Sequence, residues 1–211
     1  MPIIHFYFDF VSPYAYVAFH ALPRTLAGLP YQVVHRPLVL GALLKAHGTP
    51  VPVSLPPKRD WLFRHASWLA REQGLDFALP AVHPFNSIPW LRMALAASPQ
   101  GEPGRHVCET LFNAIWQGGR DVDDAALRDA VWQELVRELP AVRDPAEAAV
   151  KEELFAIGEA ALQHGVFGVP SCVLLPEEEG GDPELFWGVE GLPMLREALL
   201  ARTAAVEASE A

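Results

Sequence analysis

The order of β-prone and helical runs along the chain constrains its fold more than any other feature. Ile3 to Phe10 is rich in β-branched and aromatic residues, Tyr14 to Leu26 is an apolar helical run, and Tyr31 to His35 is β-prone again. Near the end, two β-prone runs precede a last helical run; these cover residues 169–175, 185–188 and 192–202. The two ends of the chain therefore predict a βαβ unit and a ββα unit.

The middle of the chain is predicted to be helical, with a proline-rich loop from Thr49 to Pro57. The predicted helices cover residues 38–47, 58–74, 88–97, 104–117, 124–139 and 145–164. A βαβ unit joined to a ββα unit is the thioredoxin pattern, so we predict an α/β, thioredoxin-like fold with an inserted all-helical domain. The thioredoxin-like domain would be discontinuous, over residues 1–40 and 165–211, and the helical domain would cover residues 41–164.

An excess of acidic residues limits the choice of partners. The chain has 26 Asp and Glu against 16 Lys and Arg, a formal net charge of -10. This argues against nucleic acid, whose phosphates need a basic face. The N-terminus lacks the features of a signal peptide, and no apolar run is long enough to cross a bilayer. We therefore expect a cytoplasmic protein with no membrane partner; a homodimer is left open.

The cysteines, histidines and tryptophans do not indicate a metal centre. Cys108 and Cys172 form no CxxC pair and are expected to be buried as small apolar groups. The eight histidines show no HxxxH or HExxH spacing, so no metal site is predicted. The tryptophans at positions 61, 68, 90, 116 and 132 fall within helical runs and are predicted to lie in the core.

Ser12 is the first candidate for chemistry, because it stands between a predicted strand and a helix that opens with Pro13. At a helix start its hydroxyl and the following N–H groups would stabilise an anion. A serine without a base is a poor nucleophile. Its better role is that of a donor to a thiolate brought by another molecule, which would lower the pKa of that thiol. The alternative is a plain helix cap.

Other candidates also have two interpretations. If the bond from Val169 to Pro170 is cis, the exposed backbone of Val169 could pair with a peptide-like ligand; otherwise the proline belongs to an ordinary loop. Basic residues near the proline-rich loop would either receive carboxylates or remain solvated at helix ends; they are Lys45, Lys58 and Arg59. Asn86 would donate to a substrate oxygen or cap the next helix.

The segment Phe8-Asp9-Phe10-Val11-Ser12-Pro13-Tyr14-Ala15-Tyr16 carries a resemblance to a known family. The chain resembles the 2-hydroxychromene-2-carboxylate isomerase family, which is related to kappa-class glutathione transferases and to DsbA-like oxidoreductases. The similarity continues in order through the lysines beside the proline-rich loop, His83-Pro84-Phe85-Asn86, Trp116-Gln117-Gly118-Gly119-Arg120-Asp121, Gly165-Val166-Phe167-Gly168-Val169-Pro170 and Phe186-Trp187-Gly188. It covers nearly the whole chain.

The resemblance implies a role for each candidate residue. Where DsbA-like proteins have CxxC, this chain has Ser12-Pro13-Tyr14-Ala15, which excludes dithiol exchange. By resemblance, Ser12 would hold the sulfur of glutathione, and Val169, before a cis Pro170, would pair with the glutathione backbone. The γ-glutamyl end would lie near Val189, Glu190 and Gly191. Lys45, Lys58 and Asn86 would line the substrate side, and Arg59 is predicted to bind substrate with them because of its charge.

The activity implied by the resemblance is a glutathione-dependent isomerisation of the 2-hydroxychromene-2-carboxylate type. It would be a cis–trans or ring-opening reaction on a small aromatic carboxylate of the pyruvate type, in aromatic catabolism. Two alternatives remain: a kappa-like glutathione transferase, and a non-catalytic DsbA-like binding protein. The chain departs from the family at Thr49-Pro50, where an Asn is usual, and at Gly191, where an Arg is usual.

Overall fold

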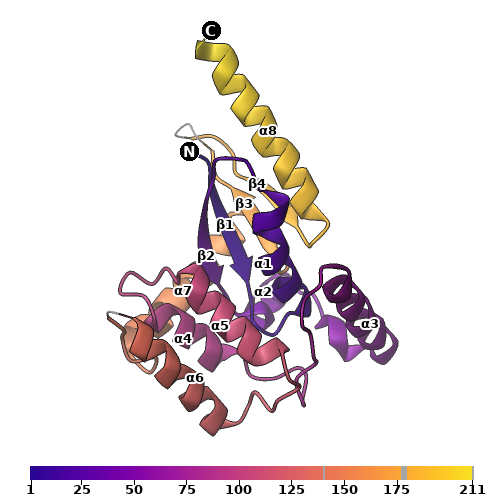
Figure 1. Ribbon diagram of the computed structural model, residues 1–211, viewed down its shortest axis with the longest axis vertical. Helices are drawn as coiled ribbons and strands as arrows, with labels where there is room; N and C mark the ends of the chain where they lie inside the picture. Colours follow the sequence, from indigo (N-terminus) through magenta and orange to yellow (C-terminus); the bar gives the residue numbers. More distant parts are fainter. Residues whose placement is uncertain (140, 177–179, 211) are drawn as a thin grey trace.

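A four-stranded mixed sheet forms the centre of the molecule (Figure 1). The computed structural model describes residues 1–139, 141–176 and 180–210. The strands are β1 (Ile3–Phe8), β2 (Gln32–Pro37), β3 (Ser171–Leu174) and β4 (Glu184–Trp187), in the spatial order β2-β1-β3-β4. β1 runs parallel to β2 and antiparallel to β3, and β3 is antiparallel to β4. The predicted thioredoxin-like fold is confirmed.

Both faces of β1 are covered, which explains why its sequence is apolar or aromatic apart from His5. The side chains at positions 4, 6, 7 and 8 are at most 1% exposed, as expected for a central strand. β1 ends at Phe8, earlier than the predicted end at Phe10. The chain leaves the sheet there because the Asp9 carbonyl accepts a hydrogen bond from Ser12 N (3.0 Å), which closes a turn.

Two helices pack against each other beside the sheet, α1 (Pro13–Thr25) and α8 (Gly191–Glu210) (Figure 1). α1 begins at Pro13, where the missing N–H of proline costs nothing because the first helical N–H groups have no partner within the helix. α8 continues beyond the predicted end at Arg202 to Glu210. The alanines and glutamates of this stretch favour helix.

The rest of the chain between β2 and β3 is helical, as predicted. Its elements are α2 (Leu40–Ala46), the 3-10 turn η1 (Pro52–Ser54), α3 (Pro56–Glu72), α4 (Ile88–Ala96), α5 (Arg105–Trp116), α6 (Ala125–Glu138) and α7 (Ala148–Gln163). The α-helix ends agree with the predicted ones to within three residues. The proline-rich loop is shorter than predicted, because η1 occupies part of it and Pro56 and Pro57 start α3.

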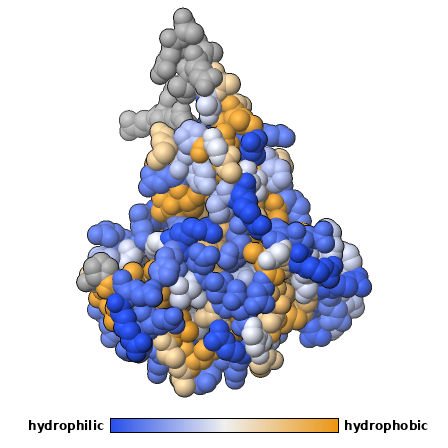
Figure 2. All heavy atoms as spheres, viewed as in Figure 1, coloured by the Kyte–Doolittle hydropathy of each residue, from blue (hydrophilic) through white to orange (hydrophobic). Residues whose placement is uncertain are grey.

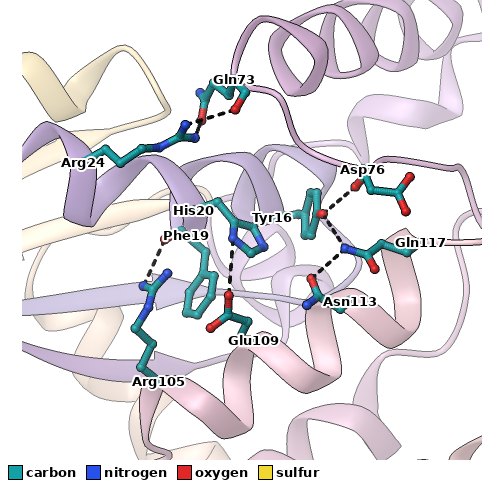
Figure 3. A network of polar contacts seen from close by, with 10 residues as sticks. All are labelled: Tyr16, Phe19, His20, Arg24, Gln73, Asp76, Arg105, Glu109, Asn113 and Gln117. Carbon is teal, nitrogen blue, oxygen red and sulfur yellow. Dashed lines mark hydrogen bonds and ion pairs between the residues drawn. The ribbon is translucent and has the colours of Figure 1, made fainter.

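A single apolar cluster joins the sheet to the helical block. It includes Phe8 and Phe10 from β1 and the turn after it, and Phe112 and Trp116 from α5. Phe112 contacts Phe10 with ring centroids 4.7 Å apart. A polar network around Tyr16 and Gln117 also joins α1 to α5 (Figure 3). The outer face of the helical block is largely hydrophilic in Figure 2, with apolar residues scattered between polar ones.

Candidate active site

Ser12 lies in the turn between β1 and α1 and caps the helix. Its backbone is extended (φ -91°, ψ 116°), and its Oγ accepts a hydrogen bond from Ala15 N at 3.2 Å. The residue is only 6% exposed. The hydroxyl proton has no acceptor among the residues that the structure describes, so the group can still donate while it caps. The interpretation of Ser12 as a helix cap is confirmed. This role does not exclude hydrogen-bond donation from Ser12 to a thiolate.

A buried carboxylate, Asp9, holds this turn in place. Its Oδ1 accepts from Val11 N (3.1 Å) and its Oδ2 accepts from Leu40 N (2.8 Å), at the start of α2. The Ser87 hydroxyl donates to it as well. Burial raises the pKa of Asp9 to about 6, although these hydrogen bonds oppose the rise. Sequence reasoning missed this residue; the signal was a lone acid, Phe8-Asp9-Phe10, in an apolar run.

Val169 and Pro170 lie at the same end of the sheet as Ser12. The peptide bond between them is cis, as the resemblance implied. Because Ser171 pairs with Tyr7 in antiparallel register, the residues just before β3 lie beside the residues just after β1. The Pro170 carbonyl accepts from Gly188 N at 2.9 Å. The backbone N–H and C=O of Val169 have no hydrogen-bond partner in the described chain, so they are available to a ligand.

The loop from β4 to α8 reaches the same end of the sheet. Trp187 pairs with Ser171, the loop contains the predicted residues Val189 and Glu190, and the third predicted residue, Gly191, opens α8. Burial first, and the Glu190 carboxylate second, raise the pKa of Tyr14 to about 12. The negative charge of Glu190 therefore acts on the first turn of α1. Gly191 is buried at the start of α8, and a Cβ there would lie 2.9 Å from the Phe186 carbonyl carbon.

The residues predicted to bind substrate are exposed and are not brought into contact with Ser12. Lys45 lies in the last turn of α2, and Lys58 and Arg59 lie in the first turn of α3. Arg59 Nε is 3.4 Å from an Asp60 carboxylate oxygen. The Asn86 side chain accepts from Ile88 N at 3.2 Å before α4, which is the alternative capping role. The substrate roles of these four residues stay predictions.

Two residues that sequence reasoning did not select hold the turn from outside. His83 Nε2 hydrogen-bonds to the Val11 carbonyl (2.7 Å) and Trp116 Nε1 donates to the Phe10 carbonyl (2.9 Å). His83 also precedes a second cis peptide, to Pro84. In the motif His83-Pro84-Phe85-Asn86, Asn86 is the candidate residue predicted from the sequence. The structure shows that His83 is the residue that contacts the Ser12 turn.

α3 flanks the site and carries an exposed aromatic face. Tyr14 Oη lies 3.0 Å from His65 Nδ1, which joins the first turn of α1 to α3. His65 stacks between Trp61 and Trp68, with ring centroids 5.9 Å from each. These tryptophans are 54% and 46% exposed, so their predicted place in the core is wrong. Trp90 and Trp116 are fully buried, as predicted.

Neither thiol belongs to the site. Cys108 and Cys172 are at most 2% exposed, as predicted, and burial raises the pKa of both. Within residues 1–139, 141–176 and 180–210, no group of three or more His, Cys, Asp or Glu side chains could hold a metal ion. In the same ranges, none of the helices is both long enough and apolar enough for a membrane span.

Comparisons with known proteins identify the class. A family model described as a DSBA-like thioredoxin domain matches residues 3–200, and the chain therefore belongs to the DSBA-like thioredoxin domain family.

Individual relatives show which members of this family the chain is similar to. A 2-hydroxychromene-2-carboxylate isomerase of Pseudomonas sp. (strain C18) is 28% identical over 200 residues, which cover 93% of this chain and 90% of the relative. The glutathione s-transferase kappa 2 of Caenorhabditis elegans is 21% identical over 93% of this chain and 91% of its own. A solved 2-hydroxychromene-2-carboxylate isomerase superposes with a TM-score of 0.78 at 26% identity, over 99% of both chains. The resemblance seen in the sequence is confirmed.

Proposed function

We propose that this protein is a glutathione-dependent isomerase that acts on a small aromatic carboxylate at the Ser12 end of the sheet. The observation that carries the proposal is Ser12 itself: a nearly buried hydroxyl that caps α1 and keeps its proton free to donate. Where DsbA-like proteins have the first cysteine of CxxC, this chain has a hydroxyl that is suited to bind a thiolate. The isomerase relatives support the reaction, and the kappa transferase relative supports glutathione as the thiol.

The residues around Ser12 fit a peptide-like thiol. The unused backbone groups of Val169 would pair with its amide groups. The start of α8 at Gly191 would face its γ-glutamyl carboxylate, and Glu190 would attract its ammonium group. Bound glutathione would supply a thiolate that adds to a conjugated carbon of the substrate and is expelled after bond rotation.

The chain's own residues would do the remaining work. Ser12 Oγ–H and the positive end of α1 would stabilise the thiolate and hold its pKa down. Lys45, Lys58 and Arg59 would receive the substrate carboxylate, and Asn86 would donate to a substrate oxygen, where negative charge develops. The buried Asp9 would position Ser12 by fixing the backbone of the turn.

Ser12→Ala tests the donor role. We expect turnover with glutathione to fall by about 100-fold or more, because removal of one donor to a developing charge typically costs that much. The loss of the cap costs only about 1 kcal/mol of stability. Asp124→Ala is the matched control: Asp124 Oδ1 caps α6 by accepting from Ala126 N (3.0 Å), and its loss removes a cap of the same kind outside the site.

Isomerisation is followed by absorbance at fixed glutathione, with urea unfolding of both variants. Equal turnover in Ser12→Ala and Asp124→Ala at matched stability would remove Ser12 from the chemistry. Activity without added glutathione would contradict the proposed role of glutathione in the reaction.

A kappa-like glutathione transferase is the second candidate, favoured by the kappa relative. Both reactions use the same thiolate site, but a transferase leaves the sulfur on the product. Mass spectrometry of the product decides between them: an unchanged substrate mass supports the isomerase, and a stable glutathione adduct contradicts it. We also propose the cytoplasm as the compartment, in keeping with two unpaired, buried thiols.

A further inference from the structure

A cavity of about 330 Å³ lies at the free edge of the sheet, away from Ser12. Its wall is formed by Leu22 and Pro23 at the end of α1, by the β2 residues around Val33 and His35, and by the segment that leads into α5. Leu22 is ten positions after Ser12 along the chain, or roughly 15 Å at 1.5 Å per residue. Ligand pockets span about 300–1,000 Å³, so the volume suits a small ligand.

β2 presents unused backbone groups to this cavity. β2 is an edge strand. Gln32 N donates to the Pro2 carbonyl just before β1, and Leu38 N donates to the Phe8 carbonyl of β1, both at 2.9 Å. Because alternate residues of a strand face the same neighbour, the N–H and C=O of Val33 and His35 face away from β1. These groups have no hydrogen-bond partner in the part of the chain that the structure describes. Pro37 occupies the next outward position, where it has no N–H to leave unpaired.

The cavity also holds a positioned guanidinium, that of Arg105. Pro23 has no N–H, so it cannot satisfy the Phe19 carbonyl one turn earlier in α1. Arg105 Nη1 donates to that carbonyl at 3.3 Å, and its guanidinium carbon lies 4.3 Å from the centre of the Phe19 ring (Figure 3). A proline inside the helix thus creates the acceptor that fixes the arginine at the cavity wall.

This arginine has no carboxylate within ion-pair distance among the described side chains, although it is largely buried. Glu102, the acid on the cavity wall, is 3.4 Å from Arg36 instead. Arg105 is also the first residue of α5, whose cap residue is Gly104 with no side-chain cap. The positive end of that twelve-residue helix therefore adds to the charge of the guanidinium.

His35 completes the wall. It is 8% exposed, and its Nδ1 lies 3.1 Å from the Pro103 carbonyl, which makes Nδ1 the protonated nitrogen of the neutral ring. Burial first, and Arg105 second, lower the pKa of His35 to about 4, so the ring is neutral near pH 7. Nε2 is then an acceptor for a ligand N–H.

We propose that this cavity binds the C-terminal end of an extended peptide. The peptide carboxylate pairs with Arg105 and the start of α5, and the peptide backbone adds to β2 through Val33 and His35. The apolar side chains of the wall accept the last peptide residue. This site is separate from Ser12 and does not depend on glutathione.

The probe is a synthetic peptide, acetyl-Thr-Val-Thr-Val with a free carboxylate, and its C-terminal amide is the matched ligand control. Binding is followed by amide chemical shifts of the labelled protein. We expect a saturable shift with a Kd at or below about 1 mM for the acid. The Val33, His35 and Arg105 amides should move, with no shift at Ser12. The amide should bind about tenfold more weakly, because it lacks the charged acceptor.

Two variants separate the parts of the site. Arg105→Gln should reduce acid binding about tenfold and leave amide binding unchanged. Val33→Pro removes an outward N–H without touching the β1 ladder and should weaken both peptides. Arg24→Gln removes a cation from α1 that bonds to Gln73 outside the cavity, and should have no effect. Equal binding of acid and amide, shifts at other residues, or an acid peptide that is still far from saturation at about 10 mM would each overturn the proposal.

Discussion

Asp9, just after β1, joins its own turn to α2 and to Ser87 before α4, so its ionisation couples this junction to pH. Its folded-state pKa is about 6, above the ordinary value of 3.8, because burial disfavours the charged form. Between these two values the folded protein binds more protons than the unfolded chain. The contribution of Asp9 to the free energy of unfolding therefore falls as pH rises from about 4 to 6.

Asp9→Asn should remove this pH dependence. The shift of about two pKa units corresponds to about 3 kcal/mol over the whole titration. About 2 kcal/mol of this falls between pH 4 and pH 6, so the difference in unfolding free energy between wild type and Asp9→Asn should change by about 2 kcal/mol across the window. Urea unfolding at pH 4 and pH 6 measures it. The comparison must be with the variant, because His5 and His35, with pKa values lowered to about 4 by burial, oppose the trend. A constant difference between the two proteins would contradict the prediction.

At the scale of elements, the Tyr14 hydroxyl links the first turn of α1 to α3 through His65 Nδ1 at 3.0 Å and the Leu62 carbonyl at 3.4 Å. Tyr14→Phe removes both contacts and keeps the ring. We expect about 1 kcal/mol lower stability and faster amide exchange in residues 58–72, because α3 loses this polar link to α1. Tyr31→Phe is the control, since the Tyr31 hydroxyl has no partner among the described residues. If α3 exchanges at the wild-type rate in both variants, the contact does not hold the helix.

Local sequence was sufficient to predict the elements but not their junctions. The runs around Ile3 and Val169 gave strands, and Ser12-Pro13 gave a helix start, because these signals depend on neighbouring residues. The effect of Glu190 on the pKa of Tyr14 depends on the antiparallel register of β3 and β4, which no local pattern specifies. The burial of Asp9 likewise requires partners from α2 and Ser87, far along the chain.

The tryptophans of α3 also show that a local pattern does not determine tertiary packing. Trp61 and Trp68 follow a helical spacing that is typical of a buried face, but the packed positions of α3 are Ala66 and Ala70. Periodicity identifies a face of a helix; the face that is covered depends on where its neighbours lie. Here α3 packs its alanines inward, which leaves the ring stack of Trp61, His65 and Trp68 on the open side.

For the molecule as a whole, the sheet and the helical block share one core rather than two. Phe8, Phe10 and Phe112 meet at ring centroid distances of 4.7 to 5.3 Å, and Trp116 reaches across to the Phe10 carbonyl. An insertion that packs on the sheet in this way cannot unfold alone without exposing that cluster. Folding should therefore be cooperative over the whole chain, although the chain order separates the two parts.

Phe112→Ala tests this cooperativity. Removing a buried phenylalanine costs about 3–5 kcal/mol. Phe112 contacts Phe19 of α1 as well as Phe8 and Phe10. The lost packing therefore destabilises both the helical block and the sheet with α1. Circular dichroism at 222 nm follows mainly the helices, and tryptophan fluorescence follows all six tryptophans, among them Trp116 at the junction with the sheet and Trp187 in β4. Both transitions should shift together by the same amount in urea, whereas two separate transitions would show that the helical block is an independent folding unit.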